Sequence, residues 1–110
     1  MSALSGSIWT LHRRKDETLL AELVITGGDF PWLRARIEAR DELAEVRPLF
    51  VEELRLLDYI NEDAESWERA YDAVVDAVTL RHPGGHIVAE FLLHLDRDEA
   101  WWRWSDEGDH

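Results

Sequence analysis

Cysteine is absent from the 110 residues of the chain. Without thiols the protein forms neither a disulfide bond nor a thiolate metal site, so any metal would need His, Asp or Glu ligands. No apolar run approaches the roughly 18 residues of a membrane span, and the start of the chain lacks the basic and apolar regions of a secretory signal. These absences predict a cytoplasmic protein with no membrane segment.

Basic residues are scarce. Lys and Arg together number 12 against 24 Asp and Glu, which gives a net charge of −12. Residues 1–40 carry six basic and five acidic side chains, whereas residues 41–110 carry six basic and 19 acidic. This charge argues against binding to nucleic acid or to an anionic membrane, because neutralising phosphates requires clustered Lys and Arg. It permits a basic protein partner. The 11 arginines beside a single lysine are typical of a GC-rich bacterial genome.

Sequence signatures of common enzymes are also missing. The chain contains no GxxxxGK[ST], GxGxxG, GxSxG, HExxH or EF-hand pattern, and the pair Gly27–Gly28 alone does not indicate phosphate binding. We therefore identify no catalytic residue and no cofactor, and the sequence favours a non-enzymatic role.

The clearest pattern that is present lies in residues 86–104. Alternation over residues 86–95 indicates a strand with two different faces. One face is apolar and is expected to join the core: Ile87, Ala89, Phe91, Leu93 and Leu95. The other mixes apolar and ionisable side chains: His86, Val88, Glu90, Leu92 and His94. A turn at 96–99 then leads to a further strand over residues 100–105.

Similar patterns predict the remaining elements. Apolar and β-branched runs indicate strands over residues 7–13, 18–26, 32–39 and 78–82. Asp41 is predicted to cap a short helical turn. Longer helices are predicted to begin at Pro48, which suits a first helical position, and after Asp63, a predicted N-cap. The link between these two helices is short, so they should form an antiparallel hairpin.

The predicted order of elements is β-β-β-α-α-β-β-β. Because short turns join consecutive strands, we expect an α+β fold: an antiparallel sheet of five to six strands with the helical hairpin packed on one face. A chain of this length fits one domain over residues 1–110, with residues 1–6 and 105–110 as frayed tails.

The sheet face turned away from the predicted core could gather imidazole and carboxylate groups. These are His12, Glu22, His86, Glu90 and His94, beside Trp102 and Trp104 or Trp101. Such donors suit zinc or iron, but donors from adjacent strands would have to converge, because residues four apart on one strand are about 13 Å apart. A solvated polar sheet face is the simpler alternative.

Tryptophan and arginine side chains indicate a second candidate surface. The residues concerned are Trp101, Trp102 and Trp104 on the last strand and Trp32, Arg34 and Arg36 on the third. The three tryptophans of the last strand must point to both faces, so at least one ring lies off the core. Tryptophan is enriched in binding hot spots, and an arginine ladder could hold an anionic ligand or an acidic partner. Core and rim packing, with the arginines paired to nearby acids, explains the same pattern.

The outward face of the predicted hairpin is acidic. Residues 41–79 carry 12 acids and three arginines. The outward acids of the second helix are Glu65, Glu68, Asp72 and Asp76. Toxin antidotes and nucleic-acid mimics use such surfaces for fast association with basic partners. A solvated surface that maintains solubility is the plain alternative.

Three segments, FPWLRARIE, EVRPLF and EFLLHLDRDEAWWRWSDE, resemble segments found in the same order in a family of small uncharacterised bacterial proteins. The likeness spans most of the chain and implies a compact single domain. It brings no activity, cofactor or catalytic residue to this chain.

Our preferred hypothesis is a non-enzymatic protein-interaction module, of the inhibitor or immunity type, that binds its partner through the acidic helices or the Trp-rich sheet face. The alternative is a small-ligand or metal-binding protein that uses the His, Glu and Trp side chains of the outward sheet face. A symmetric homodimer that hides the aromatic face is a third class.

Overall fold

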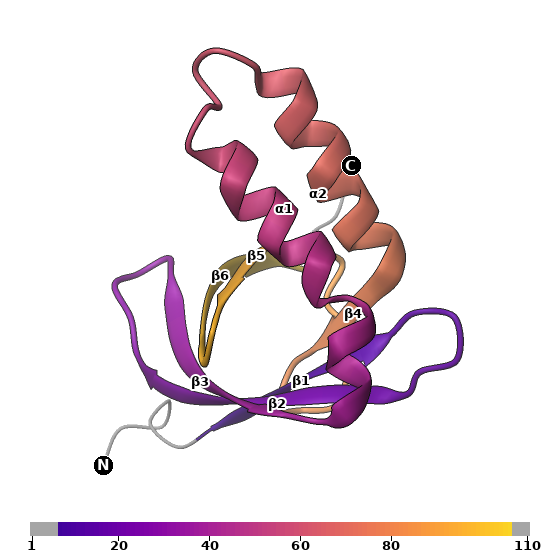
Figure 1. Cartoon of the computed structure of the whole chain (residues 1–110). Helices are drawn as coiled ribbons and strands as arrows, with labels where there is room; N and C mark the ends of the chain where they lie inside the picture. Colours follow the sequence, from indigo (N-terminus) through magenta and orange to yellow (C-terminus); the bar gives the residue numbers. More distant parts are fainter. Residues whose placement is uncertain (1–6, 107–110) are drawn as a thin grey trace.

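The computed structural model describes residues 7–106, which form six strands and two α-helices in the predicted order (Figure 1). The strands are β1 (Ile8–Arg13), β2 (Leu19–Gly27), β3 (Leu33–Ala39), β4 (Val78–Arg81), β5 (Glu90–Asp96) and β6 (Glu99–Ser105). The helices are α1 (Arg47–Leu57) and α2 (Ala64–Ala77), preceded by a short 3-10 helix, η1 (Asp41–Glu45). The predicted α+β fold is therefore confirmed.

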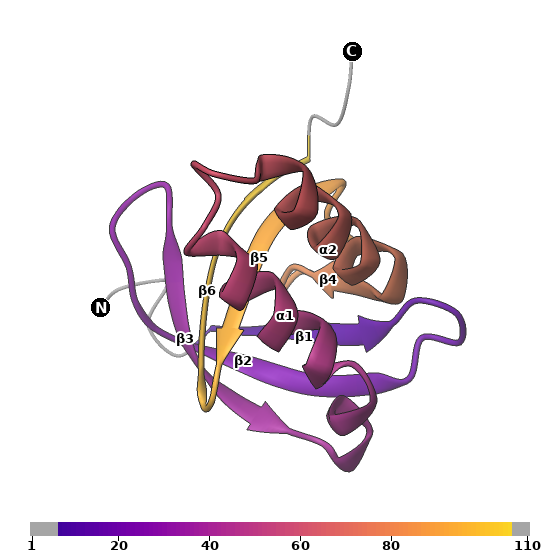
Figure 2. The ribbon, with the colours of Figure 1, turned by 45° about the horizontal axis from the view of Figure 1, so that its top comes forward.

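All strands belong to one antiparallel sheet in the order β4-β1-β2-β3-β6-β5. The sheet curls until it is almost a barrel, with β4 and β5 as its two edges (Figures 1 and 2). These edges are joined only loosely. Within residues 7–106 the link consists of a bridge between Arg81 and Ile87 with two backbone hydrogen bonds, both at 3.0 Å. The Val88 N–H donates to the Leu80 carbonyl oxygen, and the His82 N–H donates to the His86 carbonyl oxygen.

The helical hairpin packs beside the free edge of the sheet, where α1 runs along β5 (Figure 2). Its second helix begins at the predicted cap, because the Asp63 carboxylate accepts a hydrogen bond from the Ser66 N–H at 3.1 Å. Bonds from the hydroxyl and the N–H of Ser66 lower the pKa of the Asp63 carboxyl below its ordinary value of 3.8. Asp41, in contrast, does not cap η1. The residue before this helix is Arg40, and no side chain caps it.

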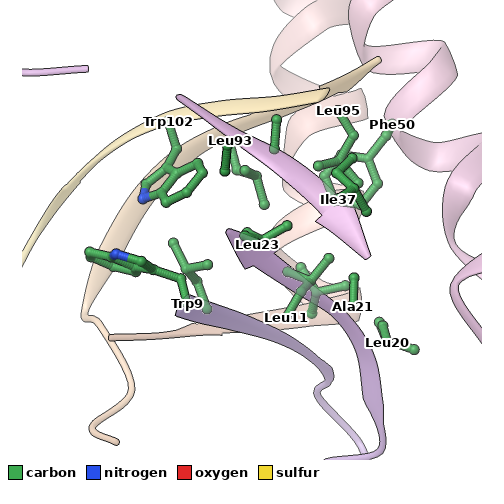
Figure 3. Packing of buried hydrophobic residues seen from close by; sticks show 14 of the residues in the cluster. Trp9, Leu11, Leu20, Ala21, Leu23, Ile37, Phe50, Leu93, Leu95 and Trp102 are labelled. Carbon is green, nitrogen blue, oxygen red and sulfur yellow. The ribbon is translucent and has the colours of Figure 1, made fainter. Parts of the chain in front are cut away.

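The hydrophobic core fills the inside of the curled sheet. Trp9 and Leu11 of β1, Leu23 of β2 and Trp102 of β6 face one another there, and Phe50 reaches the same core from α1 (Figure 3). All five are almost fully buried. Alternation along each strand produces this arrangement, because every second side chain points inward.

The alternation predicted for residues 86–95 is wrong in its first part. Strand β5 begins only at Glu90, Ile87 is 49% exposed, and Val88 is buried. The reason is that residues 87 and 88 bond to β4 rather than to β6, which turns the side chain of Val88 inward. From Glu90 onward the alternation follows the prediction, with Leu93 and Leu95 in the core.

Most residues of the predicted frayed tails, 1–6 and 107–110, lie outside the described part of the chain. Ser105 is the last residue of β6, so the strand extends into the range predicted to fray. Within residues 7–106, neither helix has the length and apolar character needed to cross a bilayer.

Candidate functional site

A pocket of about 800 Å³ opens at one end of the curled sheet. Its walls come from the start of β1, the end of β2, the loop over residues 28–32, residues 82 and 83 after β4, and Trp104 near the end of β6. In an antiparallel sheet these strand ends meet at the same side, so the pocket lies at the mouth of the near-barrel. Mouths of β-barrels are a common position for ligand sites.

Trp9 forms the floor of the pocket and joins it to the core. The residue is 3% exposed, and its ring meets three other rings edge-on: His82 at 4.9 Å, Trp104 at 5.2 Å and Trp102 at 5.4 Å between centroids. His82 and Trp104 also contact each other, with centroids 5.4 Å apart. These contacts fix the rings before any ligand arrives, so binding would cost little side-chain entropy.

A tight loop places aromatic side chains at the rim. Gly28 has φ of +144°, and a Cβ atom there would lie 2.3 Å from the Trp32 carbonyl oxygen, so only glycine lets the chain pass this close. The Trp32 N–H also donates to the Asp29 carbonyl oxygen at 2.7 Å. Phe30, at the tip, lines the pocket and is 99% exposed. A fully exposed phenylalanine contributes nothing to the core, which favours a contact role.

His82 is held in a defined orientation. Its Nδ1 atom accepts a hydrogen bond from the Gly84 N–H at 2.9 Å. The ring stacks on His86 with centroids 4.8 Å apart, and His86 Nε2 in turn lies 2.7 Å from an oxygen of the Asp106 carboxylate. Thus the turn after β4 and the end of β6 together position the imidazole that lines the pocket.

The pocket has no charged lining. None of the described residues that line it is Asp, Glu, Lys or Arg, although these types make up 33% of the chain. An ionised ligand group would therefore enter without a partner of opposite charge, which is costly in an apolar site. The lining suits an apolar ligand.

A second cluster lies between the hairpin and the outer side of β5. Glu53 of α1 is fully buried and His94 of β5 is 3% exposed, with Glu53 Oε1 2.9 Å from His94 Nδ1. The other carboxylate oxygen accepts a hydrogen bond from the Trp67 Nε1–H of α2 at 2.7 Å. Trp32 stacks on the His94 ring with centroids 6.0 Å apart, and the Trp101 ring lies tilted against it at 5.5 Å. This cluster ties three elements together.

The expectation that His94 points outward into solvent is therefore wrong, because α1 covers that side of β5. The two other histidines of the proposed metal set also have separate surroundings. His12 contacts the Thr10 hydroxyl and the Glu17 carbonyl oxygen, and His86 pairs with Asp106. Among residues 7–106 no three His, Asp or Glu side chains form a group that could hold a metal ion. The metal set His12, Glu22, His86, Glu90 and His94 thus gains no support from the geometry.

The proposed tryptophan and arginine surface is divided among several places. Trp32 and Trp104 line the pocket, whereas Trp102 is fully buried in the core. Trp101 lies beside His94 and is the cross-strand partner of Arg34. Arg36 forms an exposed ion pair with Glu38 at 2.8 Å. Only the first pair therefore belongs to the pocket.

The four acids of the second helix do share one exposed face of α2. Glu65, Glu68, Asp72 and Asp76 are all exposed, and among residues 7–106 the only ion pair to any of them is a 4.0 Å contact between Arg69 and Glu65. This face is mainly negative, and Arg69 is a basic residue within it.

Several residues of these sites were not identified from the sequence. Trp9, Phe30 and His82 lie in three different segments, and no spacing in the sequence connects them. Glu53 did carry a signal, because it lies between Phe50 and Leu57 on the apolar stripe of α1. A carboxylate in such a position is a sign of a buried polar contact.

Comparison with known proteins gives no match to a protein-family model, a curated protein or a solved structure.

Proposed function

We propose that the protein binds a small, largely apolar ligand in the pocket at the mouth of its near-barrel. The observation that supports this most is the wall of fixed aromatic rings around a space of about 800 Å³, in which the described lining residues carry no charge. Pockets of this size with mainly apolar walls and few polar groups are typical of small-molecule sites.

The proposal keeps the small-ligand hypothesis but moves it from the outer sheet face to the barrel mouth. Trp32 and Trp104 remain in it, and Trp9, Phe30 and His82 are added. Burying a two-ring apolar molecule against these rings would release water from both surfaces. Each Å² of apolar area removed from water would contribute about 25 cal/mol of favourable free energy.

Naphthalene is a suitable first probe, because it tests the apolar pocket alone. The protein has six tryptophans, each with one indole N–H signal in a 1H–15N spectrum. We expect naphthalene to shift the signals of Trp9 and Trp104 in a saturable way. The signal of Trp67, whose N–H is bonded to Glu53 away from the pocket, is the internal control and should not move. Absent or uniform shifts would contradict the proposal.

A second proposal concerns the acidic face of α2. The exposed row Glu65, Glu68, Asp72 and Asp76 supports an interaction with a basic protein, in the manner of an inhibitor or antidote. Electrostatic steering would then make association fast and dependent on salt.

The test is an association experiment with a basic partner captured from the source cell. Neutralising the four acids to Gln and Asn should slow association and flatten its salt dependence. The matched control neutralises four other exposed acids, Asp41, Glu42, Glu90 and Glu99. Equal effects of both variants would point to net charge alone and would remove the α2 face from consideration.

A further inference from the structure

Apart from the hydroxyl groups of Ser7 and Thr26, the polar side chains that line the described part of the pocket are indole and imidazole groups. The indole groups of Trp9, Trp32 and Trp104 are donors only, and within residues 7–106 none of them donates to an acceptor. The Thr26 hydroxyl is already engaged, because it donates to the Arg34 carbonyl oxygen at 3.3 Å. The pocket therefore offers unused donors against apolar walls.

His82 adds the best defined of these donors. Its Nδ1 atom accepts the Gly84 N–H, so the proton of the neutral ring lies on Nε2. The Nε2–H has no acceptor among residues 7–106. Contacts with Trp9, Trp104 and His86 hold the ring in place, so this donor would keep its direction when a ligand enters.

The net charge of the protein and the uncharged lining of the pocket limit the class of ligand further. The net charge of −12 disfavours the approach of an anion, and among residues 7–106 the pocket lining has no Lys or Arg to hold one. The same residues place no carboxylate in the lining to hold a cation. An uncharged ligand is neither repelled by the net charge nor left without a partner of opposite charge in the pocket.

We infer that the ligand is an uncharged, flat ring compound with a carbonyl-type acceptor that the Nε2–H of His82 binds. This inference rests on the proposed pocket function and specifies the chemistry of the same site. The aromatic walls would contact the ring faces, and the imidazole would fix the orientation of the ring through one hydrogen bond.

The test compares two probes of the same ring size. Coumarin carries a carbonyl acceptor, and naphthalene carries none. Replacing His82→Phe keeps a flat ring between Trp9 and Trp104 but removes the donor. We expect this variant to bind coumarin about five-fold more weakly and naphthalene with unchanged affinity, as loss of one neutral hydrogen bond predicts. His12→Phe, which alters an imidazole at the other end of β1 that does not line the pocket, is the control and should change neither affinity.

The outcomes separate the inference from the proposal on which it rests. If both probes bind at the Trp9 and Trp104 signals and His82→Phe weakens neither or both equally, the inferred hydrogen bond is wrong while the pocket stands. If neither probe binds there, both fail. If 1-methylquinolinium, a cation of the same size, shifts these signals at lower concentration than coumarin, the uncharged class is wrong.

A measurement on the unaltered protein covers the case in which the variant fails to fold. Coumarin should change the 15N shift of His82 Nε2 in a long-range 1H–15N imidazole spectrum, whereas naphthalene should leave it in place. An unchanged Nε2 shift at saturating coumarin would overturn the inference without any substitution.

Discussion

A single hydroxyl group satisfies two backbone groups on the free edge of β5. The Tyr71 hydroxyl donates to the Phe91 carbonyl oxygen and accepts from the Leu93 N–H, both at 2.8 Å. An edge strand normally leaves such groups exposed and available for unwanted pairing with another chain. Here a side chain from α2 occupies the position of a neighbouring strand, so the helix and the sheet edge stabilise each other.

Replacing Tyr71→Phe should destabilise the protein by about 1–3 kcal/mol, because two buried backbone groups lose their partner. Urea unfolding would measure the loss, and hydrogen exchange should show reduced protection of the Leu93 amide. The chain offers a matched control in its only other tyrosine, Tyr59, which is 57% exposed. Equal losses in Tyr71→Phe and Tyr59→Phe would show that the edge contact does not contribute.

The same residue predicts how stability depends on alkaline pH. Burial raises the pKa of the Tyr71 hydroxyl above its ordinary value of 10.0. Above pH 10 the unfolded chain therefore releases a proton that the folded protein retains, so the unfolded state is favoured as pH rises. The contribution of the protonated Tyr71 hydroxyl to the free energy of unfolding is complete below pH 10. Above pH 10 the free energy of unfolding falls, with a slope that approaches about 1.4 kcal/mol per pH unit.

The composition makes this titration easy to isolate, because the chain has one lysine and no cysteine. Urea midpoints measured from neutral pH upward should fall above pH 10 in the unaltered protein and in Tyr59→Phe. The fall should be clearly smaller in Tyr71→Phe. Parallel curves for all three proteins would mean that Tyr71 does not control alkaline stability.

At the scale of elements, the Glu53 carboxylate joins α1, α2 and β5 through its bonds to Trp67 and His94. Glu53→Leu would leave two buried polar groups without a partner and should cost on the order of 3 kcal/mol. Glu53→Gln should cost less, because the amide oxygen can accept from Trp67 while the amide nitrogen donates to His94 Nδ1. Urea unfolding of the two variants would give this order.

The control for Glu53 is its neighbour Glu52, which is exposed and paired with Arg55 at 2.7 Å. Glu52→Leu should change stability by no more than about 0.5 kcal/mol. A loss in Glu52→Leu as large as that in Glu53→Leu would indicate a general effect of removing an acid from α1, and the buried contact would then carry no special weight.

The elements themselves were predictable because each has a local cause. Alternation predicted the strands, and Pro48 and the Asp63 cap predicted where the helices begin; both agree with the structure. The errors have a different origin. Whether His94 faces solvent depends on α1, which is about 40 residues away along the chain, with the Glu53 contact separated by 41 residues. Alternation states which side a residue occupies but not what covers that side.

At the scale of the whole molecule, the pocket could not be predicted, because the curl of the sheet creates it. Trp9 and Trp104 lie at opposite ends of the described chain, yet their ring centroids are 5.2 Å apart. Their strands, β1 and β6, are not neighbours in the sheet, so the two rings meet only because the whole sheet curls. The sequence contained the tryptophans but no information on which of them meet.

The net charge of −12 is also a property of the whole molecule, and α2 shows its cost. Glu68, Asp72 and Asp76 follow one another at four-residue spacing along the helix. Each acid therefore repels the next one, which destabilises the helix. Asp76 also lies in the last turn, where the helix dipole disfavours an acid and where α2 has no basic residue of its own. The basic group at this end comes from another segment, because the Arg14 guanidinium donates to the Val75 and Val78 carbonyl oxygens at 2.9 and 3.0 Å.

Neutralising Asp72→Asn and Asp76→Asn together should therefore stabilise the protein by about 1 kcal/mol at low salt. The gain should shrink between about 10 mM and about 150 mM NaCl, since the Debye length falls from about 30 to about 8 Å. Glu65→Gln is the opposite control, because an acid in the first turn is favoured by the dipole and its loss should destabilise the helix slightly. Urea midpoints at both salt concentrations measure all three effects. A gain in stability that stays constant with salt would show that charge repulsion is not its cause. The acidic row would then not destabilise the folded protein, and binding of a basic partner would have no such repulsion to relieve.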